Sequence, residues 1–231
     1  MARRAAAVSS RDTMLASIRR SLGVSGHEAP RRGAVDERLA RHPVGIVPER
    51  GQRAPPERLE LFRAMVELAA GTVEEIARAD DVPASIAAFL RAHNLPSAVR
   101  RGGDPRLEAM PWTRERTLAV ATGRSDGGDL VAVSHAFGAA AETGTLMLTS
   151  GPDNPTTLNF LPDTHIVVVQ AKDVAGDYET LWRRLREARR DGTMPRTVNW
   201  ITGPSRSADI EQTLILGAHG PRRLHVIVVG E

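Results

Sequence analysis

The sequence of 231 residues contains no cysteine and few aromatic residues, and only one of its 31 basic residues is a lysine. Without cysteine, the chain can form no disulfide and can supply no thiol nucleophile or thiolate ligand for a zinc or iron–sulfur site. Aromatic residues make up 3% of the chain, too few for the stacking platforms that bind single-stranded nucleic acid. A formal charge of +3 over this length also argues against a nucleic-acid partner.

Long apolar runs are missing as well. No uninterrupted run reaches the length that spans a bilayer, so we do not expect an integral membrane protein. The N-terminal arginines are similar to those of a signal peptide or a mitochondrial presequence, but charged residues such as Arg11, Asp12 and Arg19 interrupt any apolar segment. We therefore interpret the segment as a surface helix of a cytoplasmic protein.

The first quarter of the chain differs in composition from the rest. Met14, Ile18 and Leu22 fall at helical spacing and predict a helix that Gly23 ends. Residues 23–56 contain five glycines, five prolines and little periodicity, which predicts a flexible Arg/Pro/Gly-rich tether. A catalytic lid is the alternative for a loop of this length. We therefore expect a helix and tether over residues 1–56 and a folded domain over 57–231.

Helices and strands alternate in residues 57–231. Helices are predicted at residues 57–70, 83–93, 174–190 and 207–216, and strands at 72–77, 97–101, 117–121, 129–135, 145–149, 165–170, 197–202 and 224–229. The alternation in the second half predicts parallel strands joined by right-handed crossovers in an open α/β sheet. Ligands in such sheets bind at the carboxyl ends of the strands.

Three polar turns beside apolar strands are candidates for a functional site. The first holds Glu142, Thr143, Gly144 and Thr145. Its glycine lets the backbone approach a ligand, and a partly desolvated Glu142 can act as a base or a nucleophile. A hairpin turn with a solvated acid is the alternative interpretation.

The second turn begins at Gly203, between a predicted strand and a predicted helix. Ser205, Arg206 and the free N–H groups of a helix start make an anion site. Asp209 in the first helical turn would repel a phosphate, which favours a hydroxy acid or a polyhydroxyl ligand. The alternative is an ordinary helix capped by Ser207.

The third turn places His219 next to Gly220, where an exposed imidazole can transfer protons near neutral pH. A surface histidine without function is the alternative. The seven histidines show no metal-binding spacing, so no metal site is predicted. His135 and His165 lie on or beside predicted strands and are interpreted as structural histidines with satisfied hydrogen bonds.

In combination, these segments resemble the LUD (lactate utilisation) domain family. The resemblance rests on residues 141–145, 161–162 ahead of the HIVVV strand, 203–211 and 217–221, and covers residues 130–231. The chain length and the short N-terminal helix are similar to the lactate-utilisation protein C type. Many relatives carry an arginine where this chain has residues 156–160, so Arg206 is expected to supply the positive charge instead.

The resemblance implies a Rossmann-like three-layer α/β domain similar to the sugar-phosphate isomerase and CoA-transferase group. It also implies a component of a three-part system that oxidises L-lactate to pyruvate, with iron–sulfur clusters on partner subunits. No side chain can accept the two electrons, so a redox partner is required. Two alternatives stay open: a stand-alone acyl- or phosphosugar-handling enzyme with Glu142 as nucleophile, and a non-catalytic metabolite-binding or assembly subunit.

The resemblance further implies a polar pocket for a small hydroxy acid. Glu142 would be its acid, base or orienting carboxylate. Asp209 and His219 would orient the ligand or relay protons, and Arg206 would pair with the ligand's carboxylate. The other residues expected to bind the ligand carry hydroxyls or expose their backbone: Thr143, Gly144, Thr145, Gly203, Ser205 and Gly220.

Overall fold

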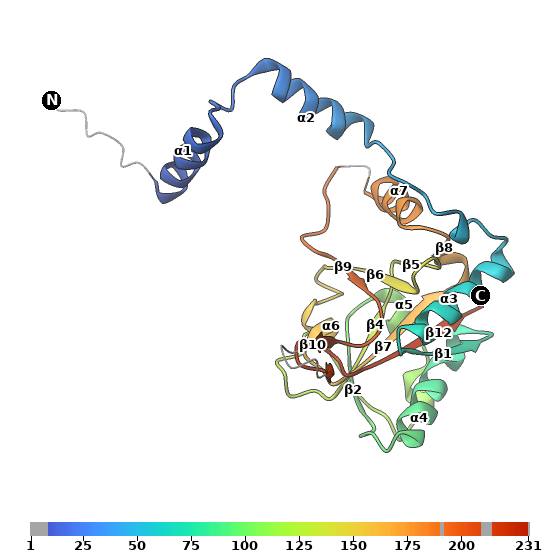
Figure 1. The fold of residues 1–231 in the computed structure, drawn as a ribbon. Helices are drawn as coiled ribbons and strands as arrows, with labels where there is room; N and C mark the ends of the chain where they lie inside the picture. Colours follow the sequence, from blue (N-terminus) through green and yellow to red (C-terminus); the bar gives the residue numbers. More distant parts are fainter. Residues whose placement is uncertain (1–8, 190–191, 209–213, 231) are drawn as a thin grey trace. The chain divides into compact units, whose positions relative to one another are not determined.

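The computed structural model describes residues 9–189, 192–208 and 214–230. The chain divides into two compact units, residues 1–45 and residues 46–231, which we call the N-terminal unit and the main unit. The N-terminal unit contains helices α1 (Ser10–Leu22) and α2 (Ala29–Arg41), and the main unit is an α/β fold (Figure 1).

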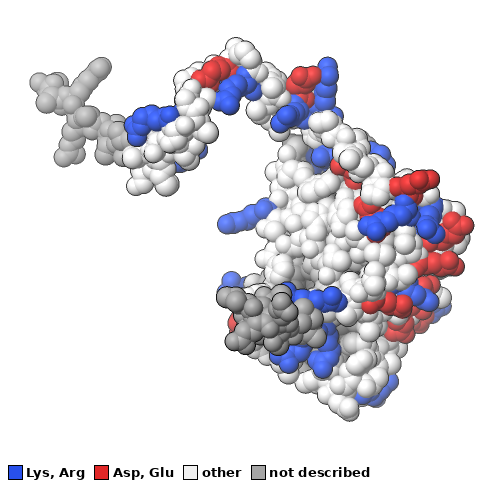
Figure 2. Space-filling model, in the orientation of Figure 1, with Lys and Arg blue, Asp and Glu red and all other residues white. Residues whose placement is uncertain are grey.

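Local capping defines the first helix of the N-terminal unit. Ser9 is the N-cap, its Oγ accepts a hydrogen bond from the N–H of Asp12 at 3.2 Å, and Gly23 ends the helix at φ 63°. The helix predicted to contain Met14, Ile18 and Leu22 and to end at Gly23 is thus confirmed as α1. Neither α1 nor α2 contains a buried residue, and arginine side chains stand on the visible surface of both helices (Figure 2).

Helix α2 corrects the prediction of an irregular tether over residues 23–56. It begins with Pro30 in its first turn, a position where proline is favourable because the N–H it lacks has no helical partner. Its apolar residues are few, since only Val35 and Leu39 stand one turn apart among polar neighbours. This weak periodicity explains why the helix is not visible in the sequence pattern.

The main unit is built on a six-stranded parallel sheet with the strand order β1-β12-β7-β4-β2-β3. Its strands are β1 (Thr72–Ile76), β2 (Ala98–Arg101), β3 (Ala119–Thr122), β4 (Val131–His135), β7 (Thr164–Gln170) and β12 (Arg223–Val229). The apolar run of β7 lies between β12 and β4 and is buried, as expected for a strand covered on both faces. The predicted parallel α/β sheet is therefore confirmed for these strands.

Different layers cover the two faces of this sheet. Ile86 and Leu90 of α4 (Val82–Ala92) pack on one face, in a cluster that includes Val133 of β4. Phe62 and Val66 of α3 (Pro55–Leu68) pack on the other face, together with the residues of a second, smaller sheet. Helix α7 (Tyr178–Ala188) packs on the far side of that smaller sheet.

The smaller sheet is mixed, with the order β8-β5-β6-β9. Its strands are β5 (Gly138–Ala140), β6 (Thr145–Thr149), β8 (Val174–Ala175) and β9 (Val198–Ile201). The prediction that the strand at residues 197–202 is a parallel neighbour in the main sheet is wrong. A short turn after β5 returns the chain antiparallel as β6, and β9 pairs antiparallel with β6, so both leave the main sheet.

The helix predicted at residues 207–216 is also wrong. Residues 206–208 form β10 and residues 214–216 form β11, and the two pair antiparallel with Arg206 opposite Leu216. The short apolar segment at 214–216 fits a strand as well as a helix, and periodicity alone does not separate the two in so short a run. The anion site at a helix start therefore has no helix in the described residues.

Short elements complete the fold: α5 (Pro105–Glu108), α6 (Thr157–Phe160), and the 3₁₀ turns Glu49–Gly51, Ala79–Asp81, Trp112–Arg114 and Ala171–Asp173. The helix predicted at 174–190 begins later, at Tyr178, because Asp177 caps it by accepting the N–H of Thr180 at 2.7 Å. Within the part of the chain that the structure describes, no helix combines the length and the apolar composition needed to cross a bilayer.

Candidate functional site

A cavity of about 270 Å³ lies where β7 and β12 begin and β9 ends. Its wall contains His165 near the start of β7, Leu224 near the start of β12, and the segment that follows β9. We expected a ligand site at the carboxyl ends of the parallel strands, and this cavity does not lie there. It lies at the amino ends of two of them, because β9 belongs to the other sheet and brings residues 202–206 to that edge.

Two of the three predicted turns meet in this cavity. Ser205 and His219 line it together with Gly220. The N–H of Ser205 donates to the carbonyl of Pro221 at 2.8 Å, and the carbonyl of Ser205 accepts from Gly217 at 3.0 Å. These backbone bonds hold the second and third turns against each other.

Two glycines allow this close packing. A Cβ at Gly220 would lie 3.3 Å from the Cβ of Ser205. Gly203 has φ +67°, and a Cβ there would lie 2.2 Å from the carbonyl oxygen of Ala69, just after α3. Only glycine fits at residue 203, so the second turn is held closely against the end of α3.

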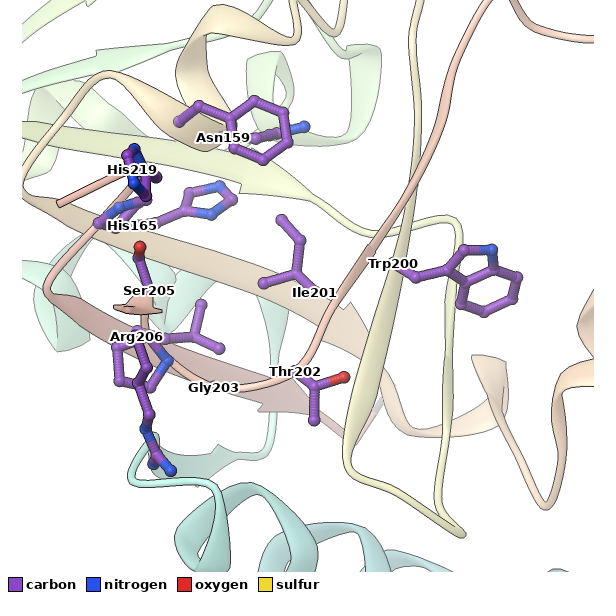
Figure 3. Close-up of a pocket in the computed structure, with 14 residues that line it drawn as sticks. Asn159, His165, Trp200, Ile201, Thr202, Gly203, Ser205, Arg206 and His219 are labelled. Carbon is purple, nitrogen blue, oxygen red and sulfur yellow. The ribbon is translucent and has the colours of Figure 1, made fainter. Parts of the chain in front are cut away.

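Arg206 brings a guanidinium to the cavity wall. Its side chain is exposed, and Nη2 donates to the carbonyl of Ala69. A guanidinium has five N–H donors, and the bond to Ala69 uses only one of them. In Figure 3 the guanidinium points away from Asn159, His165 and His219, toward the end of α3, so the pairing of Arg206 with a ligand carboxylate stays a prediction.

A buried hydrogen-bond chain runs behind the cavity. His165 is fully buried, and its Nε2 lies 2.9 Å from Oγ of Ser134, which in turn donates to Oδ1 of Asn159 at 3.4 Å. Burial lowers the pKa of His165 to about 3, so the imidazole is neutral. Asn159 and His165 both line the cavity, and Nδ1 of His165 has no hydrogen-bond partner in the structure.

Figure 3 shows how the labelled side chains are distributed. Asn159, His165, Ser205 and His219 are grouped on one side of the view, whereas the indole of Trp200 extends away from them and packs against Tyr178 and Trp182. Apolar residues of the cavity wall include Phe160, Ile201 and Leu224. The cavity therefore combines a polar part with an apolar part. Such a combination is typical of small-molecule sites, in which a few polar groups fix the orientation of the ligand.

The turn around Glu142 does not line this cavity. Glu142 is 3% exposed, its Oε1 accepts the N–H of Tyr178 at 3.2 Å, and its Oε2 is buried without a partner in the structure. The alternative interpretation of this turn is thus confirmed for the hairpin, since β5 and β6 pair antiparallel across it, and wrong for the solvated acid, since Glu142 is buried. Gly144 has φ +66°, and a Cβ there would lie 2.5 Å from the backbone nitrogen of Val66, so this turn also packs against α3.

A cluster of hydroxyls joins the Glu142 turn to the cavity. The hydroxyl of Tyr178 lies 2.8 Å from those of Thr143 and Thr145, which are 2.7 Å apart. Thr145 also lies 2.6 Å from the hydroxyl of Thr202, which lines the cavity. Since each hydroxyl can both donate and accept, the cluster can pass a proton between the turn and the cavity wall.

The structure thus brings together five of the predicted site residues in the cavity wall: Gly203, Ser205, Arg206, His219 and Gly220. Thr143 and Thr145 reach the wall only through Thr202, and Glu142 and Gly144 lie behind them. Asp209 lies outside the described residues.

Sequence reasoning missed Asn159, Thr202 and Tyr178 and misjudged His165. Asn159 lies in the segment 156–160, where many relatives carry an arginine and this chain does not. This departure from the family pattern could have drawn attention to the segment. The interpretation of His165 as a satisfied structural histidine is wrong, since Nδ1 has no partner in the structure. Nothing in the sequence pattern distinguishes such a histidine from a satisfied one.

His135 is a second buried histidine, at the carboxyl end of β4. Its Nδ1 lies 2.8 Å from the carbonyl of Ala136, and Nε2 is buried without a partner in the structure, so it too is not fully satisfied. Burial and the charge of Arg106 lower the pKa of His135 to about 4. Arg106 itself is paired with Asp104 at 2.7 Å. His135 is not among the residues that line the cavity.

Metal binding finds no support in the described ranges, which contain no group of three or more histidine, aspartate or glutamate side chains arranged to hold an ion. The candidate site therefore consists of hydrogen-bonding side chains, one guanidinium and an apolar wall.

Comparison with known proteins gives three results. A family model described as LUD domain matches residues 59–229. Proteins named Lactate utilization protein C are 40% identical over 90 residues in Geobacillus thermodenitrificans and 37% identical over 92 residues in Bacillus subtilis. These alignments cover 38% and 39% of this chain and 38% of each relative, so the chain spans well under half of the relatives it matches.

The third result concerns the fold alone. A crystal structure of a DUF162 family protein from Deinococcus radiodurans superposes with a TM-score of 0.56 at 24% identity. The superposition covers 77% of this chain and 99% of that protein.

Proposed function

The chain belongs to the LUD domain family, and from this we propose that it is a cytoplasmic component of an L-lactate utilisation system. The observation that carries the proposal is the meeting of two family segments, residues 203–206 and 219–220, in the wall of one cavity. We propose that this cavity binds a small hydroxy acid during the oxidation of L-lactate to pyruvate.

The side chains of the cavity suit each part of such a ligand. Arg206 binds the carboxylate, and Ser205 and Asn159 offer hydrogen bonds at the polar end. His219 is exposed to solvent and can carry a proton out of the cavity. The Glu142 turn contributes indirectly, because its hydroxyl cluster reaches the wall at Thr202.

Oxidation of lactate to pyruvate removes two electrons and two protons. The residues present can accept the protons but not the electrons. The chain has no cysteine, so it offers no thiolate to an iron–sulfur cluster. We therefore propose that partner subunits with iron–sulfur clusters take the electrons, and that this chain is one subunit of an L-lactate-oxidising complex.

A non-catalytic binding or assembly subunit is the second candidate, and one observation favours it. Met14, Ile18 and Leu22 recur every four residues on α1 and are 54–65% exposed. A row of exposed apolar side chains on a helix is typical of a surface that docks on another protein. In this version the cavity senses a metabolite and the complex carries out the chemistry.

Growth on L-lactate tests the proposal. In a strain that lacks the gene and has no second copy, we expect growth on pyruvate but not on L-lactate. The wild-type gene should restore growth, whereas Arg206→Gln should restore it poorly because the carboxylate loses its cation. Arg63→Gln is a matched control, since Arg63 is half-exposed, pairs with Glu75 and lies outside the cavity. Normal growth of the deletion strain on L-lactate would overturn the proposal.

Affinity capture separates the two candidates. A tagged full-length chain should retain cysteine-rich subunits that absorb in the visible range. If the purified chain alone oxidises lactate with an artificial electron acceptor, the non-catalytic candidate is wrong. If only the assembled complex does so, the chain acts through its partners.

A further inference from the structure

His165 is a buried polar group that the proposed function does not yet use. It lies in the wall of the cavity, near the start of β7, and none of its surface is exposed. A neutral imidazole has one nitrogen that donates and one that accepts. Which nitrogen accepts decides what kind of ligand atom His165 can bind.

The hydrogen-bond chain behind His165 favours one direction. Oδ1 of Asn159 can only accept, so the hydroxyl of Ser134 donates its proton there. The oxygen of Ser134 must then accept from Nε2 of His165, which lies 2.9 Å away. Nδ1 therefore carries the lone pair, and it is the buried atom of this ring that has no partner in the structure.

We propose that Nδ1 of His165 selects ligands that carry a hydroxyl over ligands that carry an oxo group at the same carbon. In terms of the proposed function, on which this inference rests, the cavity binds a 2-hydroxy acid and discriminates against the corresponding 2-oxo acid. His165 is the specificity-determining residue, and Ser134 and Asn159 are positioning residues that hold its tautomer.

The reason is the direction of the hydrogen bond. A hydroxyl donates to Nδ1 and satisfies a buried acceptor, whereas an oxo oxygen is itself an acceptor and leaves both atoms unpaired. An unpaired buried acceptor carries a large penalty, and sites built around a substrate hydroxyl reject analogues that lack it. We expect about 10- to 100-fold tighter binding of the hydroxy acid, from the usual range of this penalty.

Calorimetric titration of the full-length protein tests the inference. L-lactate would be compared with pyruvate, and L-2-hydroxybutyrate with 2-oxobutyrate, because a cavity of about 270 Å³ accepts more than three carbons. Propionate, which carries neither a hydroxyl nor an oxo group at carbon 2, should also bind weakly. The expected result is preference for the hydroxy acid in both pairs, and equal binding within both pairs would overturn the inference.

Substitution assigns the preference to His165. His165→Gln should bring the two affinities of a pair to within about threefold, because an amide can turn to donate or accept. His135→Gln is the matched control: it also removes a buried histidine that has one unpartnered nitrogen, but outside the cavity, and it should keep the preference. If His165→Gln keeps the full preference, or His135→Gln loses it, the inference is wrong.

A spectroscopic measurement covers the case in which His165→Gln does not fold. In the wild-type protein labelled with ¹⁵N, His165 should show a protonated Nε2 and an unprotonated Nδ1. The Nδ1 resonance should move when 2-hydroxybutyrate is added and much less with 2-oxobutyrate. The opposite tautomer would overturn the inference.

The outcomes also separate this inference from the proposed function. If neither acid of either pair binds, the inference fails, while growth on L-lactate still decides the proposed function. If lactate binds without preference and the deletion strain cannot grow on it, the proposed function stands and the role of His165 does not.

Discussion

The N-terminal unit and the main unit are stabilised by different means. Residues 1–45 hold nine arginines and four acids, and their two helices are defined by caps and by surface pairs such as Arg41 with Glu37. The main unit holds 22 basic and 24 acidic residues and buries side chains on both faces of its parallel sheet. The N-terminal unit thus combines a net charge of +5 with exposed apolar rows, whereas the main unit has a net charge of −2 and holds the buried contacts.

This difference separates two tasks. Isolated helices of 13 residues are marginal in water, and α1 and α2 contain no buried residue that would stabilise them. The main unit has its own core and can hold the cavity in a fixed shape. We infer that the N-terminal unit serves recognition and the main unit serves ligand binding.

The largest expected effect is the loss of stability of the main unit in acid. Burial lowers the pKa of His165 to about 3 and those of His135 and His225 to about 4. Below about pH 6.5 the unfolded chain binds protons on these residues and the folded chain does not, so stability is complete above pH 6.5 and falls below it. Each histidine contributes about 1.4 kcal/mol per pH unit in that window.

Urea titrations at pH 7.5, 6.0 and 5.0 measure this dependence. Together the three histidines should remove several kcal/mol between pH 6.5 and 4.5, a large part of a typical domain's stability. His135→Gln should make the dependence less steep. A midpoint that does not change between pH 7.5 and 5.0 would contradict the prediction.

The next effect compares matched core and surface truncations. Phe62 of α3 is fully buried, whereas Ile18 of α1 is 54% exposed. Phe62→Ala should lower the free energy of unfolding by about 3–5 kcal/mol, because it leaves a cavity in the core. Ile18→Ala should change it by less than about 0.5 kcal/mol. If both substitutions lower the free energy of unfolding equally in urea titration, the prediction is wrong.

Two glycines in the left-handed backbone conformation allow a comparison with a smaller expected effect on stability. Gly23 has φ +63°, and a Cβ there would have no atom within 4 Å, whereas a Cβ at Gly203 would meet the carbonyl of Ala69. Gly23→Ala should cost only the backbone conformation, about 1–2 kcal/mol of helix stability. Gly203→Ala should cost more than about 2 kcal/mol and weaken hydroxy-acid binding. Calorimetric melting and ligand titration measure both variants.

The smallest expected effect on stability comes from removing residues 1–45. The melting temperature of the main unit and its affinity for a hydroxy acid should stay nearly unchanged, because neither helix has a buried residue. Capture of the proposed iron–sulfur partners should be lost. A clear drop in melting temperature would show that the helices stabilise the main unit directly.

The sequence predicts most of the main sheet correctly. The apolar runs of β7 and β12 are long enough, and bounded clearly enough, to identify buried strands. The incorrect predictions concern short segments whose structure depends on pairing with strands elsewhere in the chain. Residues 214–216 become a strand because residues 206–208 pair with them, and β9 leaves the main sheet because β6 pairs with it.

The candidate site was only partly predictable. Turns with glycine and polar residues are visible in the sequence, and Ser205, Arg206 and His219 do meet in one cavity. His165 could not be assigned, because its significance rests on the direction of a hydrogen bond through Ser134. That direction follows from three elements, β4, α6 and β7, which only the fold brings together.

The strand order has a consequence for how the protein is made. β12 is the last strand of the main sheet along the chain, yet it lies between β1 and β7 and pairs with both. During synthesis β1 therefore has no strand partner until residues 223–229 have left the ribosome. Such distant pairings form slowly and leave strand edges exposed in the meantime. We expect the nascent chain to need protection from aggregation until its final strand is inserted.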